Sequence, residues 1–132
     1  MINDQPHLLA AYTCTPLVTI PVAELKAGSK VQGKTVAELG NQNRPLDIIT
    51  YQKEGHTFLL VANSARGVMK VATDKIASVE PIKAKVKDTA GLGYETVPNL
   101  KGVEQLDKLD DTHAVLLVKN GSAASLETLE LP

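Results

Sequence analysis

The residues of this sequence best suited to nucleophilic or metal chemistry are three histidines and one cysteine: His7, His56, His113 and Cys14. A nucleophilic cysteine needs a nearby base or positive charge that favours the thiolate, and the sequence places neither beside Cys14. A metal site needs about three converging ligands, and these residues, with Met69, show no recognisable ligand spacing. The sequence therefore predicts no catalytic residue, no metal site and no cofactor.

Two further segments resemble functional motifs only in composition. Gly91-Leu92-Gly93 lacks the third glycine of a dinucleotide fingerprint and the Gly-Lys-Ser/Thr of a phosphate loop, so we expect a flexible loop there. Asp107, Asp110 and Asp111 lack the glycine and distal glutamate of a calcium-binding EF-hand. A solvated turn is the simpler interpretation of the acidic cluster.

The two arginines of the chain, Arg44 and Arg66, mark a candidate polar binding surface. Both are expected at strand ends, and Arg44 follows a run of amides that a loop would present to solvent. The candidate binding residues are Asn41, Asn43, Arg44 and Arg66. The alternative interpretation of Arg44 is an ion pair between structural units.

Composition narrows the classes of partner. The 132 residues include 14 Lys and Arg and 15 Asp and Glu, which give a formal net charge of −1. A nucleic-acid binder is usually basic, and a membrane span needs about 18 apolar residues, so neither partner is expected. There is no signal peptide, and as given the chain reads as soluble and cytoplasmic, although a secreted domain that had lost its signal would look the same.

The apolar pattern is typical of strands rather than helices. Three short runs, Leu46–Tyr51, Thr57–Ala62 and Val68–Thr73, are separated by connections of about four or five residues that contain glycine. This spacing predicts an antiparallel meander, with a fourth strand near Val79–Val86. The unbroken apolar run in the middle strand predicts burial on both of its faces.

An internal repeat accompanies these strands. Leu59–Asn63 resembles Leu116–Asn120, and Leu8–Thr13 resembles Leu59–Ser64. His56 and His113 fall at equivalent positions, which favours a structural role for both. Four antiparallel strands repeated at about 50 residues is the period of a β-propeller blade.

The segment Pro45–Val71 resembles a blade of the YVTN/NHL-type β-propellers. It has a strand that begins with proline, a turn with Gly55, an apolar strand that ends in Val61-Ala62-Asn63, and a third strand after Gly67. The resemblance implies a propeller-like fold and carries no catalytic signature. The last unit departs from it, because Lys108–Thr112 contains no glycine.

These observations predict one all-β domain over residues 1–132, in units of approximately 7–40, 41–87 and 88–132. The expected strands number about ten, which amounts to two and a half four-stranded antiparallel blades. Closed propellers have about four to eight blades, so the chain resembles the C-terminal part of a longer propeller. Because an incomplete ring exposes apolar end faces, we expect a homo-oligomer, and two copies would supply about five blades. A small β-sandwich or barrel is the alternative fold.

The favoured function is a non-catalytic binding or scaffold module that acts through loop surfaces or through self-association. The alternative is an enzyme, a hydrolase or a lyase, whose site forms at an oligomer interface and uses Arg44, Asp47 or His56. The fold does not decide between them, because propellers support both kinds of function.

Overall fold

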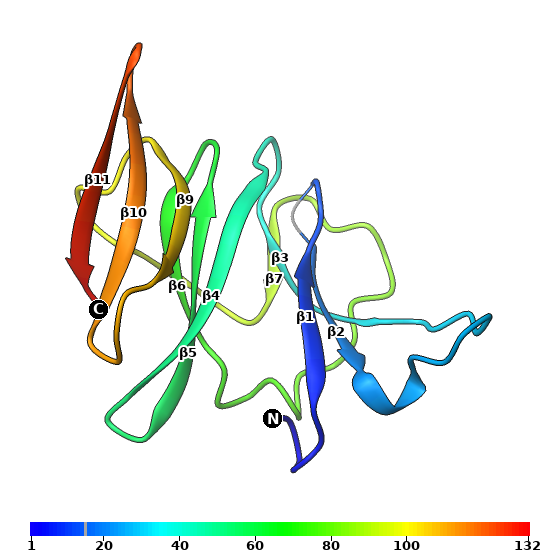
Figure 1. The fold of residues 1–132 in the computed structure, drawn as a ribbon. Coiled ribbons are helices and arrows are strands. Elements are labelled where there is room, and N and C mark those ends of the chain that lie inside the picture. Colours follow the sequence, from blue (N-terminus) through cyan, green and yellow to red (C-terminus); the bar gives the residue numbers. More distant parts are fainter. Residues whose placement is uncertain (15) are drawn as a thin grey trace.

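The computed structural model describes residues 1–14 and 16–132 and places three antiparallel sheets side by side (Figure 1). The first sheet has the order β1 (His7–Ala11), β2 (Pro16–Pro21), β3 (Lys34–Leu39) and β7 (Thr89–Gly91). The second has the order β4 (Pro45–Lys53), β5 (His56–Asn63), β6 (Gly67–Ala72) and β8 (Glu95–Thr96). The third has the order β9 (Val103–Lys108), β10 (His113–Asn120) and β11 (Ala123–Glu130).

The all-β prediction is confirmed, and none of the three sheets closes on itself. The described residues contain one short 3-10 helix, Val22–Glu24. No helix among them is long and apolar enough to cross a membrane.

Short turns join β4, β5 and β6 of the second sheet, and they join the three strands of the third sheet. Lys53 pairs with His56, so only Glu54 and Gly55 form the turn between β4 and β5, and both have positive φ. A two-residue turn with positive φ at both positions matches the right-handed twist of the flanking strands. Asn120 pairs with Ala123 across a similarly short turn in the third sheet. These turns fix the register of the hairpins.

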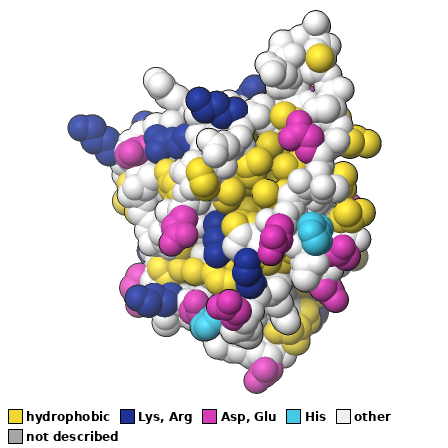
Figure 2. All heavy atoms as spheres, turned by 90° about the vertical axis from the view of Figure 1, so that its left-hand side faces the viewer, with side chains coloured by type: hydrophobic (Ala, Val, Ile, Leu, Met, Phe, Trp, Pro, Cys, Tyr) yellow, Lys and Arg dark blue, Asp and Glu magenta, His cyan; other side chains and the backbone are white. Residues whose placement is uncertain are grey.

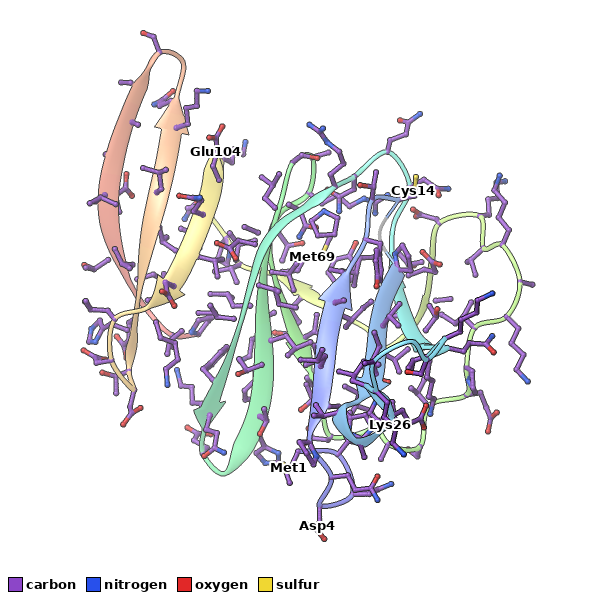
Figure 3. The ribbon with its side chains drawn as sticks, turned by 45° about the vertical axis from the view of Figure 1, so that its right-hand side comes forward. Met1, Asp4, Cys14, Lys26, Met69 and Glu104 are labelled. Atoms are coloured by element: carbon purple, nitrogen blue, oxygen red, sulfur yellow. The ribbon has the colours of Figure 1, made fainter. Side chains whose placement is uncertain are left out.

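Two apolar cores lie between the three sheets. In β5, Leu59 and Val61 belong to the core shared with the first sheet, whereas Leu60 and Ala62 belong to the core shared with the third. All four side chains are fully buried, which confirms the predicted burial of this strand on both faces. Met69 on β6 lies in the space between the second and first sheets (Figure 3). The second sheet is therefore the middle layer of the molecule.

The predicted fourth strand at Val79–Val86 is wrong. This segment forms no ladder with another strand. Its backbone contacts β3 through a hydrogen bond of 3.0 Å, in which the N–H of Ile82 donates to the carbonyl oxygen of Thr35. The fourth strands come from further along the chain, because β7 pairs with β3 and β8 pairs with β6.

The pairing of β7 and β8 with earlier strands corrects two further predictions, the number of strands and the loop at Gly91–Gly93. The described residues hold eleven strands in sheets of four, four and three, rather than about ten strands in two and a half units. Leu92 is buried in the core between the first two sheets, and its N–H donates to the carbonyl oxygen of Val36. Gly91, at φ +74°, lies so close to this carbonyl that a Cβ would overlap it, so only glycine allows β7 to dock here.

Candidate binding surfaces

The four residues predicted to form a polar binding surface do come together at one end of the second sheet. Asn41, Asn43 and Arg44 lie in the connection between β3 and β4, and Arg66 lies in the turn between β5 and β6. The register places this connection beside the turn, because Asn63 pairs with both Pro45 and Gly67. The four residues differ, however, in how much of each side chain remains available to a ligand.

Asn43 belongs to the interior. Its side chain is 2% exposed, and its Nδ2 donates to Oδ1 of Asn63 at 2.9 Å. Its Oδ1 accepts a hydrogen bond from the backbone N–H of Ala65 at 3.2 Å, and Nδ2 of Asn63 donates to the carbonyl oxygen of Val61. Because buried amides are costly unless paired, this arrangement stabilises the strand ends rather than presenting a donor to solvent.

Arg66 joins loops that are far apart in the sequence. Its guanidinium donates to Oδ1 of Asp88 at 2.6 Å, to the hydroxyl of Tyr94 at 3.2 Å and to the carbonyl oxygen of Asn41 at 3.4 Å. Hydrogen bonding to Tyr94, and then to Asp88, raises the pKa of Arg66. The guanidinium covers Gly40, where a Cβ would overlap it. These contacts tie the chain on either side of β7 to the second sheet.

Arg44 is the member of the group that remains open to solvent. Its backbone is fixed by Ser64, whose Oγ accepts from the N–H of Arg44 at 3.0 Å. Among the described residues, its exposed guanidinium has no hydrogen-bond partner, and it lines a groove of about 570 Å³ between the second and third sheets. Glu104 and Gln105 of β9 line the same groove, and Figure 3 shows Glu104 at the upper end of β9. The groove therefore offers a cation, a carboxylate and an amide to a polar ligand.

The three residues of the alternative enzyme site do not meet within one chain. Arg44 directly precedes β4, whereas His56 pairs with Lys53 at the opposite end of that strand. Asp47 has a structural role, because its carboxylate accepts hydrogen bonds from the N–H groups of Ile48 and Leu106. His56 is exposed beside Asp74, with 2.8 Å between Nδ1 and Oδ1, and this hydrogen bond raises its pKa.

A cavity of about 610 Å³ lies outside the surface that the sequence predicts. It lies near the N-terminus and receives side chains from β1, β4 and β5, among them His7, Thr50, Gln52 and Thr57. Tyr51 also lines it, and burial together with Glu95 raises the pKa of Tyr51 to about 12. Its hydroxyl is engaged with the carbonyl oxygen of Pro132 at 2.7 Å. Thr50 and Gln52 are polar residues at alternate positions of β4, so they lie on one face of the strand. This pattern was the signal of the cavity in the sequence.

Within the part of the chain that the structure describes, no three His, Cys, Asp or Glu side chains are placed to hold a metal ion together. Cys14 is exposed at the turn after β1, at φ +70° (Figure 3). It lies at the upper end of the first sheet in Figure 3.

A second surface, on the third sheet, was not assigned to particular residues by the sequence. Val115 and Leu117 of β10 and Leu126 of β11 share the face that points away from the second sheet, because Leu116 and Ala114 point into the core. Leu126 is 75% exposed, and a groove of about 440 Å³ runs from these side chains towards β4. Figure 2 shows this side of the molecule, where hydrophobic side chains gather between acidic, basic and histidine side chains.

The outer edge of the third sheet is also open. Among the described residues β11 pairs with β10 alone, so the backbone groups on its far edge are not part of a ladder. An exposed edge of eight residues is a template for pairing with another strand. The third sheet therefore combines an uncovered apolar face with an unpaired edge.

No family model, curated protein or solved structure matches this chain. The resemblance of Pro45–Val71 to a propeller blade thus has no independent support from known proteins. The function has to be argued from the surfaces of the chain itself.

Proposed function

We propose that this chain is a non-catalytic binding or scaffold module, built from propeller-like sheets of the YVTN/NHL kind, that completes its fold by self-association. The proposal is supported by the face-to-face stacking of three antiparallel sheets, with an apolar core between each pair of neighbours. It is supported as well by the blade-like pattern of Pro45–Val71.

The observation that carries the proposal is the open state of the third sheet. The first and second sheets each have four strands, and a core covers the face that each turns towards its neighbour. The third sheet has three strands and leaves Leu126 largely exposed beside Val115 and Leu117. Natural proteins rarely leave both an apolar sheet face and a long strand edge uncovered, because such surfaces associate. A second polypeptide is the simplest cover for both.

The groove beside Arg44 supplies the binding part of the proposal. It lies where two sheets meet and is lined by groups of both charges, Arg44 and Glu104. Loop surfaces positioned by a rigid sheet scaffold are common binding sites. Binding of a polar ligand is therefore the function that the lining of this groove supports.

The concentration dependence of thermal unfolding tests the proposal. If the folded chain associates, the melting temperature rises with protein concentration, because association stabilises the folded state by mass action. The substitution Leu126→Lys should lower the melting temperature at high concentration and remove its concentration dependence. The matched control is Leu109→Lys, since Leu109 is 56% exposed but lies in the turn between β9 and β10. A wild-type melting temperature that does not change with concentration would contradict self-association.

A further inference from the structure

We propose that two copies of the chain close head to tail, so that the third sheet of each packs against the first sheet of the other. In this arrangement the segment Ile82–Lys87 of one copy lies along β11 of the other as a fourth strand. The inference rests on the proposed self-association and specifies which surfaces meet.

Among the described residues, the third sheet lacks a fourth strand. The first two sheets show how such a strand would pair. In the first two sheets the fourth strand lies antiparallel to the third, as β7 does to β3 and β8 does to β6. These fourth strands are only three and two residues long, so a short extended segment is enough. In the described part of the chain, no strand pairs with β11 at the equivalent position. This position fits an extended segment that runs antiparallel to β11.

The segment Ile82–Lys87 has the pattern of a strand without the pairing of one. Its apolar residues Ile82, Ala84 and Val86 alternate with Lys83, Lys85 and Lys87, as on the two faces of a strand. The three lysines are exposed, and within residues 1–14 and 16–132 none of them has an ion-pair partner.

The position of this segment in the fold shows why the strand beside β11 must come from a second copy. The N–H of Ile82 donates to the carbonyl oxygen of Thr35, so the segment lies beside the first sheet. Figure 1 places this part of the chain at one end of the row of sheets and β11 at the other. Within one chain the segment cannot reach β11, but head-to-tail contact brings the two ends together.

The charges of the two surfaces are complementary. β11 carries exposed Glu127 and Glu130, and residues 120–132 contain no Lys or Arg. Two lysines from other strands lie near this part of the chain: Lys119 is 3.7 Å from Glu104, and Nζ of Lys53 donates to the carbonyl oxygen of Leu131 at 2.7 Å. Glu127 and Glu130 are three residues apart, so they lie on opposite faces of β11. The lysine face of an added strand would therefore lie beside one of these carboxylates.

The apolar surfaces at the two ends also match. Leu8 and Tyr12 are 50% and 51% exposed, and Leu8 alternates along β1 with Leu9 and Ala11, which pack towards the core. Leu8 and Tyr12 are therefore available to Val115, Leu117 and Leu126. These three side chains line a groove that also contains Asp47, Gln105 and Asp107. Two copies of three sheets make six, which lies within the range of about four to eight sheets found in closed propellers. A head-to-tail contact that closes after two copies leaves neither end exposed.

A pair of charge-reversal variants tests the inference, because each variant damages a different half of the contact. The first is K83E/K85E and the second is E127K/E130K; all four side chains are exposed, so folding should be retained. Each variant alone places like charges at both contacts of a dimer and should weaken dimerisation at least about tenfold. An equimolar mixture forms a dimer with Lys opposite Glu at both contacts, so dimerisation should return. The matched control K75E/K101E reverses two exposed lysines outside the segment and should dimerise like the wild type.

Equilibrium sedimentation of the two variants, their mixture and the control reads out these outcomes. Dimers from the mixture and not from either variant alone would support the head-to-tail contact. A dimer of K83E/K85E alone as tight as the wild type would overturn this contact while leaving self-association in place. A wild-type chain that is monomeric throughout would overturn both the contact and the proposed function.

Discussion

The carboxylate of Asp47 on β4 accepts a hydrogen bond of 3.0 Å from the backbone N–H of Leu106 on β9, a residue of the neighbouring sheet. Its other oxygen accepts from the N–H of Ile48 at 2.9 Å. One side chain therefore joins the first strands of the second and third sheets across the boundary between them. The third sheet is held by this polar link as well as by the apolar core.

Removing this link should loosen the third sheet. We expect Asp47→Ala to lower the free energy of unfolding by about 1–3 kcal/mol, because the partly buried N–H of Leu106 loses its acceptor. Asp111→Ala is the control, since its carboxylate is fully exposed and its ion pair with Lys108 is worth little. Urea denaturation at fixed protein concentration measures both variants. Equal stabilities of the two variants would show that the Asp47 link does not hold the sheets together.

The buried amide pair of Asn43 and Asn63 should behave as one unit. Either single alanine variant leaves a buried polar group without its partner and should cost about 1–3 kcal/mol in unfolding free energy. The double variant should cost less than the sum of the singles, because it removes both groups together. A double-mutant cycle by chemical denaturation measures the coupling. Strictly additive effects would contradict the pairing at 2.9 Å.

Arg66 should hold the long connection between β6 and β7 in place. In Arg66→Ala the carboxylate of Asp88 and the hydroxyl of Tyr94 lose their bonds to the guanidinium, so the lysine-containing segment before Asp88 should open more often. We expect faster cleavage by trypsin after Lys83, Lys85 or Lys87 in the native protein. Arg44→Ala is the control because the guanidinium of Arg44 is exposed. Similar cleavage rates in both variants would remove the proposed role of Arg66.

Asp110 makes the stability of the folded state depend on pH in the acidic range. The N–H and hydroxyl groups of Thr112, and then His113, donate hydrogen bonds that lower the pKa of Asp110 from 3.8 to about 2. Because the pKa is lower in the folded state, the stabilisation is fully present above about pH 4 and is lost as the pH falls towards 2. Asp110→Asn should weaken this part of the pH dependence. Titration by NMR should give a midpoint near 2, and a midpoint at the ordinary value would contradict these hydrogen bonds.

The strands that the sequence predicts well are those with long apolar runs. β4, β5 and β6 lie within a few residues of the predicted ranges, because turns with glycine bound them and Leu59–Ala62 is apolar throughout. β7 and β8 escaped detection because strands of three and two residues carry no periodic signal. Their positions depend on pairing with distant strands and on the one close contact that Gly91 permits.

The binding surface was predictable in location but not in detail. Adjacent strand ends place Asn41, Asn43, Arg44 and Arg66 together, and the hairpin register implies this neighbourhood. What the sequence lacked was the set of partners, because Asp88 and Tyr94 are separated from Arg66 by 22 and 28 residues. When those partners are not known, the sequence does not distinguish a residue whose side chain joins loops from a residue whose side chain is open to a ligand.

The solution mass over a concentration series, by light scattering, tests self-association most directly. The chain has a mass of 14.1 kDa, and self-association predicts a mass that rises to twice this value and then stays constant, as a closed two-copy ring requires. A mass that remains at the single-chain value up to the highest concentration would contradict the account. The bare face of the third sheet would then be compatible with solvent, and the case for a self-completing module would fall.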